Sequence, residues 1–354
     1  PPPPPKDLQR SPGSTSPHTL DISSYNFYSL LGSGGFGKVM LASLGDKKAY
    51  VAVKSIPKKE ATKYNSLLTE SQVLNIVRHI PFLCQGYAAF QTQRHAFYVM
   101  EFLSGGSLED QLKWHRMLPM DRVRFHSAEM ICGLQYLHGL GIIHRDIKPM
   151  NVLLDHQGHV KIVDFGVAKQ SIFEDDATTG WAGTLGYMAP EILHGKAYNA
   201  AVDWWSFGVT ICEIATGQSP FYNSDPDQLK DSIKFHEPKI PDWLDEDLTH
   251  LLGKLLQKDR KQRLGVRGDI RSHPFYKGID WVALEEGELQ PPYQPKTVMH
   301  AQDCSHLRAA GIKTEWVCLS SGNSPRFHPV TATGKAGAKL FHKFTIHKNM
   351  KHFL

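Results

Sequence analysis

Hydrophobic and polar positions follow different periods along the chain. From Phe27 to about position 102, short apolar runs alternate with polar positions, as in residues 51–54, and this period of two predicts strands. Residues 61–77 interrupt them with apolar side chains at helical spacing. Further on, residues 118–140 carry a longer apolar stripe, which predicts a helix that packs in a core. The pattern therefore predicts a β-rich part followed by a helical part.

Composition narrows the class of protein. The chain has 354 residues, of which 41% are hydrophobic, enough for one large or two modest lobes. The net charge is +5 with both signs well mixed, so charge gives no reason to expect nucleic-acid binding. The longest apolar run, at about residues 207–216, is too short to span a membrane and contains Glu213.

The number and spacing of the cysteines indicate the cellular compartment in which the protein is expected. There are five, an odd number at irregular spacing without a C-x-x-C pair, namely Cys84, Cys132, Cys212, Cys304 and Cys318. This pattern is typical of reduced thiols, so we expect a cytoplasmic protein.

The first 24 residues differ from the rest. They are rich in proline and serine, open with five prolines and lack apolar periodicity, which predicts a disordered linker over residues 1–24. Docking of a proline-binding partner domain is the alternative for this tract.

Residues 143–151 carry the strongest chemical signal, the pattern H-R-D-x-K-x-x-N. Asp146 can accept the proton of an incoming hydroxyl, and Lys148 can lie beside a phosphoryl group in transfer. The side-chain oxygen of Asn151 can bind a metal ion. If this is a phosphoryl-transfer loop, a Gly-rich phosphate cover and a strand lysine must lie upstream, and a metal-binding aspartate downstream.

The glycine cover is found at residues 32–37. A G-x-G-x-x-G run also occurs in dinucleotide-binding turns, but that alternative, an oxidoreductase, needs a helix directly after the glycines. Here residues 39–42 continue as an apolar strand, which favours a loop over the phosphates of ATP. The ATP-binding residues expected from this loop, the next strand and the hinge are Leu31, Gly32, Ser33, Gly34, Gly35, Phe36, Gly37, Lys38, Val39, Ala52, Lys54, Met100, Glu101 and Leu103.

The strand lysine is Lys54, at the end of residues 51–54. Such a lysine holds the α- and β-phosphates and needs a carboxylate to position it. Glu70 in the predicted helix is the preferred partner, and Glu60, which precedes that helix among lysines, is the competitor. Downstream, Asp164 ends an apolar strand before Phe165 and a glycine, and suits a carboxylate that binds Mg²⁺.

Further residues are expected to support this site. Residues 97–103 form a strand that runs into a hinge at Ser104, where backbone groups bind adenine and Met100 closes the pocket behind. Asp203 is expected to hold the backbone of the catalytic loop, and Glu191 to pair with Arg263. Thr184 is expected to steady Asp146 and Lys148.

Together these residues resemble a eukaryotic protein kinase over residues 25–296, and Lys148 after H-R-D resembles the serine/threonine class. Finer segments resemble the AGC group and, within it, the catalytic domains of novel, delta- or theta-like protein kinase C. These segments are residues 99–106, 133–138, 203–208, 263–266, 273–275 and 291–296.

The resemblance implies an α+β, bilobal fold with a β-rich small lobe over residues 25–102 and a helical large lobe over residues 103–275. Residues 276–354 are then an AGC-like C-terminal extension that diverges after position 296. The implied cofactors are ATP and Mg²⁺, and the partners are protein substrates phosphorylated on serine or threonine. A monomer is expected, without nucleic acid, in the cytoplasm with nuclear or peripheral-membrane pools. Regulatory lipid- and calcium-binding modules are absent from the sequence.

The rival function is that of a pseudokinase, in which the same fold serves as an ATP-binding scaffold. Pseudokinases usually lack the strand lysine, the H-R-D aspartate or the metal aspartate. All three are present here as Lys54, Asp146 and Asp164, so catalysis is preferred.

The segment from Asp164 to Glu191, called the activation segment below, departs from the resembled family. The family carries a phosphorylatable threonine where this chain has Gly180. Thr178 and Thr179 are near but shifted, and Asp175 or Asp176 is expected to supply negative charge toward Arg145. We therefore predict activity without phosphorylation of this segment.

Substrate selection is expected to differ as well. Two positions that are acidic in basophilic relatives are Ser107 and Met150 here, whereas Glu213 remains acidic. Each lost carboxylate removes a charged partner worth about 1–3 kcal/mol when hydrogen-bonded, so selection for basic flanking residues should be weaker.

The tail diverges most. In relatives, the C-terminal tail folds back on the small lobe through an F-x-x-F-[S/T] motif, which residues 341–345 match loosely. Ser324, which precedes a proline, is a candidate second phosphosite. Residues 339–351 are basic with interleaved phenylalanines and are expected to form a solvated terminus, with contact to an acidic surface or membrane as the alternative.

Overall fold

The computed structural model describes residues 22–34, 37–44, 49–58, 61–77, 79–173 and 176–295, with no side-chain description for residues 61–65. The N-terminal tract up to position 21 and the tail from position 296 lie outside these residues, as do Gly35, Phe36, Glu60 and Asp175. Predictions for the F-x-x-F motif, Ser324 and the basic terminal run therefore also fall outside the described residues.

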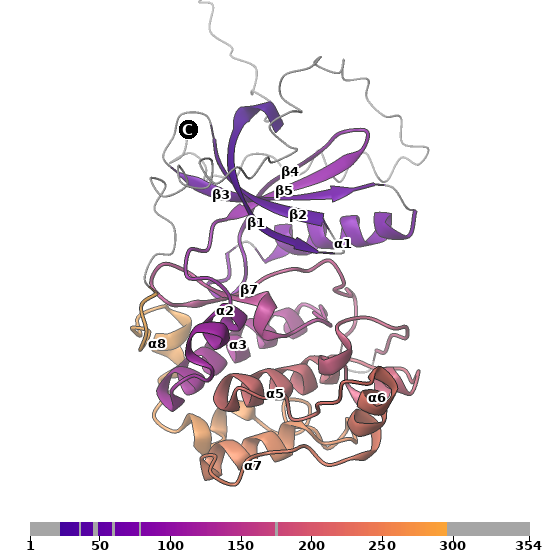
Figure 1. Cartoon of the computed structure of the whole chain (residues 1–354), viewed down its shortest axis with the longest axis vertical. Coiled ribbons are helices and arrows are strands. Elements are labelled where there is room, and N and C mark those ends of the chain that lie inside the picture. The colour runs from indigo at the N-terminus through magenta and orange to yellow at the C-terminus, as the bar shows by residue number, and fades with distance from the viewer. Residues whose placement is uncertain are drawn as a thin grey trace, which may run out of the picture.

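Two differently built parts stand one above the other (Figure 1). The upper part is a five-stranded antiparallel sheet with strand order β1-β2-β3-β5-β4 and one helix, α1, against it. Its elements are β1 (Tyr25–Gly34), β2 (Gly37–Leu44), β3 (Tyr50–Pro57), α1 (Ala61–Ile76), β4 (Gly86–Gln91) and β5 (His95–Glu101). The β-rich small lobe expected from the alternating pattern is thus confirmed.

The lower part is helical and contains one two-stranded hairpin. Its helices are α2 (Leu108–His115), α3 (Met120–Gly139), α4 (Pro190–Leu193), α5 (Ala201–Thr216), α6 (Pro226–Phe235), α7 (Glu246–Leu255) and α8 (Trp281–Glu285). The hairpin pairs β6 (Val152–Leu154) with β7 (Val160–Ile162). Short 3-10 helices cover Ile22–Ser24, Pro149–Asn151, Leu185–Tyr187, Ile270–Ser272 and Pro274–Tyr276. Within the described ranges, none of these helices has the length and apolar character needed to cross a bilayer.

The predicted linker reaches slightly too far. Ile22–Ser24 form a 3-10 helix, and Ile22 packs against a small-lobe cluster that includes Tyr25 and Val51. Ile22 thus packs with the small lobe, a contact that the composition of the tract does not reveal.

The period of two in β3 decides where Lys54 points. Val51 and Val53 pack in the cluster on one face of the sheet, and Ile56 packs with Leu67 of α1 on the other. Because alternate side chains of a strand share a face, Lys54 lies on the face covered by α1. The hydroxyl of Tyr98 donates a hydrogen bond of 2.7 Å to the carbonyl of Leu67 and fastens the helix there.

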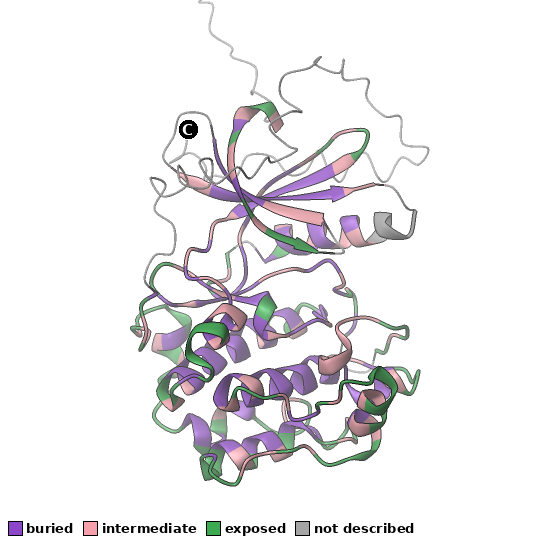
Figure 2. Cartoon of the chain, viewed as in Figure 1, coloured by how far each residue is buried: buried purple, intermediate pink, exposed green. Residues whose placement is uncertain are grey.

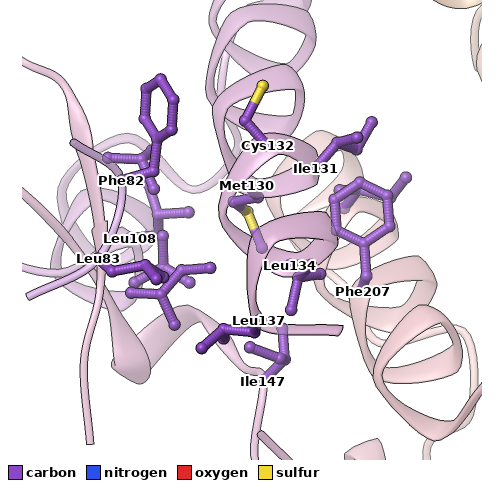
Figure 3. Packing of buried hydrophobic residues seen from close by; sticks show 14 of the residues in the cluster. Phe82, Leu83, Leu108, Met130, Ile131, Cys132, Leu134, Leu137, Ile147 and Phe207 are labelled. Atoms are coloured by element: carbon purple, nitrogen blue, oxygen red, sulfur yellow. The ribbon is translucent and has the colours of Figure 1, made fainter. Parts of the chain in front are cut away.

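The core of the large lobe is built around α3 and α5; most residues of both helices are buried, and α5 is buried more completely than α3 (Figure 2). Figure 3 shows Leu134 and Leu137 of α3 between Leu83 on one side and Phe207 of α5 on the other, with Ile147 beneath them. Ile147 belongs to the catalytic loop and is fully buried. Burying such a side chain stabilises the fold by about 1.5–3 kcal/mol, so the core itself anchors the loop.

Candidate active site

The catalytic loop alternates buried apolar residues with polar residues that carry the chemistry. Ile143 and Ile147 are fully buried, and Arg145 between them has φ of +69°, a conformation that is uncommon outside glycine. Asp203 at the start of α5 compensates this strain, since its carboxylate accepts hydrogen bonds of 2.8 Å from the backbone N–H groups of His144 and Arg145. The expected role of Asp203 in holding the loop backbone is confirmed.

The environment of Asp203 also fixes its charge. Burial alone would raise the pKa of this carboxyl, but the hydrogen bond and charge of His138, the charge of His144 and the N–H of Arg145 together outweigh burial and hold the pKa below its ordinary value. The loop therefore rests on a buried anion that accepts from three N–H groups.

The loop presents Asp146 at the centre of a hydrogen-bonded cluster. Thr184 donates to its Oδ1 at 2.7 Å, and the Nδ2 of Asn151 donates to its Oδ2 at 3.0 Å. Lys148 lies 2.9 Å from the same carboxylate and donates to Thr184 at 2.7 Å. Lys148 and Asn151 from the same loop, together with Thr184 from 38 positions further along the chain, fix the carboxylate in one orientation. The expected contact of Thr184 with both Asp146 and Lys148 is present.

A second cluster joins the two lobes around Lys54. Its ammonium lies 2.6 Å from Glu70 of α1 and 2.8 Å from Asp164, which follows β7. The partner of Lys54 is thus Glu70, as expected, whereas Glu60 lies outside the described residues. Asp164 has φ of +66°, a second strained residue beside the site.

Burial and ion pairing compete at this cluster. Burial lowers the pKa of Lys54, but the carboxylates of Glu70 and Asp164 outweigh it and raise that pKa. Burial raises the pKa of Glu70 to about 7, although Lys54 opposes the shift. For Asp164, burial alone would raise the pKa, but Lys54 dominates and holds it low. Lys54 is therefore a cation at neutral pH, held in position by Asp164 and Glu70.

Gly32 and Gly34 lie in β1, and Gly37 is the first residue of β2. A strand therefore follows the glycines, as expected, where a dinucleotide-binding turn would need a helix. Val39 stands opposite both Gly32 and Lys54, which places the hairpin over the lysine. A side chain at Gly32 would meet no atom within 4 Å, whereas one at Gly37 would lie 2.1 Å from the backbone oxygen of Ser55. The hairpin thus has open space beside Gly32 of β1 and packs tightly at Gly37, the first residue of β2.

The expected adenine end is formed by β3 and β5. Ala52 pairs with Met100, and both are buried, as is Leu103. The side chain of Glu101 turns to the back of the hinge, where it accepts from the N–H of Gln85 at 2.7 Å and lies 3.4 Å from Lys161. The N–H of Glu101 donates to the carbonyl of Gln85 at 3.0 Å, so the backbone carbonyl of Glu101 is its candidate group for contact with a nucleotide.

Two further expectations concern the large lobe. Glu191 and Arg263 form the expected buried pair, with an Nη1–Oε1 distance of 2.8 Å. The prediction that Asp176 supplies negative charge to Arg145 is wrong, because the Asp176 carboxylate accepts from the N–H of Phe173 at 3.1 Å and does not contact Arg145. Arg145 instead donates to uncharged oxygens of Val167 and Tyr198.

The positions expected to select substrate differ in exposure. The Ser107 side chain caps α2 by accepting from the N–H of Asp110 at 3.1 Å, and Asp110 bonds back to the backbone of Ser107. Met150 is 51% exposed beside the catalytic loop. Glu213 accepts from the hydroxyl of Tyr187 at 2.5 Å, and burial raises its pKa.

Sequence reasoning missed four residues that connect the site to its surroundings. Ser66 of α1 donates to the carbonyl of Gly166, and Gln170 donates to Gln72 of α1 at 2.7 Å. Tyr198 contacts Arg145 through its hydroxyl at 3.0 Å. Serine, glutamine and tyrosine outside any motif carry no signal of function, since their partners lie far away in the sequence.

Comparison with known proteins places this arrangement in a family. Residues 25–276 match the model for the protein kinase domain. The chain is 44% identical over 278 residues to protein kinase C delta type of Rattus norvegicus, covering 78% of this chain and 41% of that protein. It is 40% identical over 323 residues to protein kinase C eta type of Rattus norvegicus, covering 88% and 47%. With protein kinase C of Drosophila melanogaster the identity is 38% over 317 residues, covering 88% and 43%. The chain thus spans less than half the length of these relatives.

Proposed function

The chain belongs to the protein kinase family, and we propose that it is a serine/threonine kinase that transfers the γ-phosphoryl group of Mg·ATP to protein hydroxyls. The observation that carries this proposal is the position of Asp146. Its carboxylate is only 5% exposed and is oriented by Thr184, Lys148 and Asn151. A carboxylate held in this way can orient a hydroxyl and take its proton, and Lys148 beside it can balance charge on the phosphoryl group.

The oxygen donors near this base suit Mg²⁺. Asp164 offers a carboxylate, and Asn151 uses its amide nitrogen for Asp146, which leaves its amide oxygen for a cation. Mg²⁺ prefers oxygen ligands and is commonly held by one or two protein groups together with phosphates, whose charge it neutralises when bound. In the proposed complex Asp164 and Asn151 hold the ion, while Lys54, positioned by Glu70, holds the phosphates.

The remaining nucleotide contacts complete the proposal. The hairpin of Gly32, Ser33, Gly34, Lys38 and Val39 covers the phosphates, Ala52 and Leu31 enclose the adenine, and the backbone at Glu101 and Leu103 binds it. Catalysis then consists chiefly of positioning and charge neutralisation, which is typical of phosphoryl transfer.

The test is transfer from Mg·ATP to serine, threonine and tyrosine peptides, with an Asp146→Asn variant as control. We expect phosphorylated serine or threonine peptide from the wild type and a kcat lower by about 10²- to 10⁴-fold in the variant, the usual contribution of a general base. Nucleotide binding by the variant, followed by fluorescence, should be retained. Binding of ATP without transfer by the wild type would contradict the proposal and favour a pseudokinase.

We also propose that basic residues flanking the substrate hydroxyl contribute little. Ser107 is committed to its helix cap, Met150 offers an apolar exposed side chain, and Glu213 is engaged by Tyr187. A positional peptide array should show weaker arginine selection in the wild type than in a Met150→Asp variant. Equally strong arginine dependence in both proteins would refute this part of the proposal.

The same proposal places the enzyme in the cytoplasm as a monomer. The buried thiols of Cys84, Cys132 and Cys212 suit a reducing compartment. Fractionation of cells and size-exclusion chromatography test the two statements separately.

A further inference from the structure

The guanidinium of Arg145 is held by uncharged oxygens. It donates from Nε to the carbonyl of Val167 at 2.7 Å, and from Nη1 to the hydroxyl of Tyr198 at 3.0 Å. In many kinases activation-loop phosphorylation orders the segment through a new contact between arginine and phosphate. Here the neighbouring Gly180 has no hydroxyl to phosphorylate, and the groups that Arg145 contacts include the carbonyl and the phenol named above.

Tyr198 is fully buried and well placed for this purpose. Its backbone forms two reciprocal hydrogen bonds of 2.8 Å with Thr178 of the activation segment. Its hydroxyl accepts from Arg145 and donates to the carbonyl of Gly180 at 3.0 Å. One phenol thus connects the catalytic loop to the activation segment without any phosphate.

The backbone of Gly180 fits this arrangement. Its φ is +107°, a region that residues with a side chain rarely adopt. A threonine here would strain the very turn whose carbonyl Tyr198 contacts. Glycine therefore does more than remove a phosphorylation site, because it permits the conformation in which the carbonyl reaches the phenol.

A second contact secures the other end of the activation segment. The side-chain nitrogen of Gln170 donates to the side-chain oxygen of Gln72 on α1 at 2.7 Å. Ser66, one turn before Glu70 on α1, donates to the carbonyl of Gly166. Because α1 carries Glu70, these contacts couple the activation segment to the carboxylate that positions Lys54.

We propose that Tyr198, Gln170 and Gln72 are positioning residues that hold the activation segment in its catalytic geometry without a phosphorylated side chain. The inference rests on the proposed kinase function and assigns the residues that replace phosphate regulation at that site. None of the three touches the reacting atoms. They act through Arg145 at one end of the segment and through Glu70 at the other.

The first experiment uses the full chain, treated with phosphatase and verified by intact mass. The wild type should keep its kcat after treatment, and Tyr198→Phe should lower kcat about tenfold or more, as expected for loss of a hydrogen bond to a charged group. The KM for ATP should change little, because the phosphate-holding residues remain. Tyr222→Phe, at a 75% exposed tyrosine, is the matched control and should leave both constants unchanged.

A second set of variants avoids the buried phenol, whose loss can also affect folding. Gln72→Ala and Gln170→Ala should each lower kcat, and the double variant should be no worse than either, since both remove one contact. The pair Gln72→Lys with Gln170→Glu should restore kcat through an ion pair, which a general destabilisation would not allow.

The outcomes separate this inference from the function beneath it. A wild type that transfers phosphate only before phosphatase treatment overturns the inference and leaves the kinase function intact. Unchanged kcat in Tyr198→Phe, or additive losses in the glutamine variants, also overturns it. No transfer by the wild type in either state contradicts the kinase function and, with it, the inference.

Discussion

The two halves of the candidate site are held in different ways. The catalytic loop half lies wholly within the large lobe, where Ile147 enters the core and Asp203 binds the loop backbone. The Lys54 half depends on contacts between lobes, since Lys54 and Glu70 come from the sheet and α1 whereas Asp164 follows β7. Asp146 is therefore positioned by the large lobe alone, whereas Lys54 is positioned by contacts that involve both lobes.

This difference implies two kinds of control. Changes in the catalytic loop half should affect chemistry together with stability, because its contacts are part of a buried core. Changes in the Lys54 half should affect nucleotide-dependent steps with little loss of stability. Regulation by movement of one lobe against the other should act on the second half, where α1 meets the activation segment through Gln72 and Gln170.

The most severe test of this comparison is Asp203→Asn. The amide keeps one accepting oxygen but replaces the other with an NH2 donor, so it cannot accept from all three N–H groups and at least one buried donor loses its partner. We expect the free energy of unfolding to fall by about 2–4 kcal/mol, and kcat by about a hundredfold as the loop shifts. Urea denaturation and steady-state kinetics measure the two effects. Asp231→Asn, at an exposed carboxylate paired with Lys234, is the control and should change neither.

A loss of activity without a loss of stability in Asp203→Asn would contradict the comparison. It would mean that the loop keeps its fold independently of α5, and that Asp203 acts on the reaction by its charge alone.

A smaller effect is expected at Glu70→Gln. Lys54 keeps Asp164 but loses one charged hydrogen bond, so kcat/KM for ATP should fall about ten- to hundredfold, with the midpoint of thermal unfolding nearly unchanged. Since burial raises the pKa of Glu70 to about 7, wild-type activity should decline as the pH falls through 7 and Glu70 takes up a proton. The variant cannot titrate at this position and should lack that decline.

The pH profile of kcat/KM measures this difference. Glu285→Gln, at a half-exposed carboxylate that pairs with Arg271, provides the control and should retain the wild-type profile. An identical acid limb in Glu70→Gln would assign the decline to another group.

The smallest effect concerns His126 of α3, which belongs to neither the Asp146 cluster nor the Lys54 cluster. Burial, followed by the charge of Arg122, lowers the pKa of this fully buried ring from 6.5 to about 3. Below pH 6.5 the His126 ring is therefore protonated in the unfolded chain but remains neutral in the native state. The contribution of the neutral His126 ring to the free energy of unfolding is fully present above pH 6.5. It is lost as the pH falls toward 3, by up to about 1.4 kcal/mol per pH unit.

Replacing the ring with an apolar side chain, His126→Leu, should flatten this acid dependence without affecting kcat at neutral pH. Chemical denaturation between pH 5 and 7 is the measurement, and His156→Leu at an exposed histidine serves as the control. An unchanged slope in His126→Leu would show that other groups carry the acid sensitivity of the large lobe.

Much of this molecule follows from local sequence. The period of two gave the strands of the small lobe, and the apolar stripe at residues 118–140 became α3, Met120–Gly139. The spacing within H-R-D-x-K-x-x-N brought Asp146, Lys148 and Asn151 together, because all three lie in one short loop. Helical spacing and strand register were also enough to choose Glu70 as the partner of Lys54.

Only the tertiary structure decided which polar groups meet across long distances. Arg145 and Tyr198 are 53 positions apart, and Gln72 and Gln170 are 98 apart, so no local pattern reports either contact. The predicted pairing of Asp176 with Arg145 is likewise not found, and the Asp176 carboxylate accepts from the backbone N–H of Phe173 instead. Local sequence fixes which chemistry is available along an element, whereas packing of distant elements decides which partner each group receives.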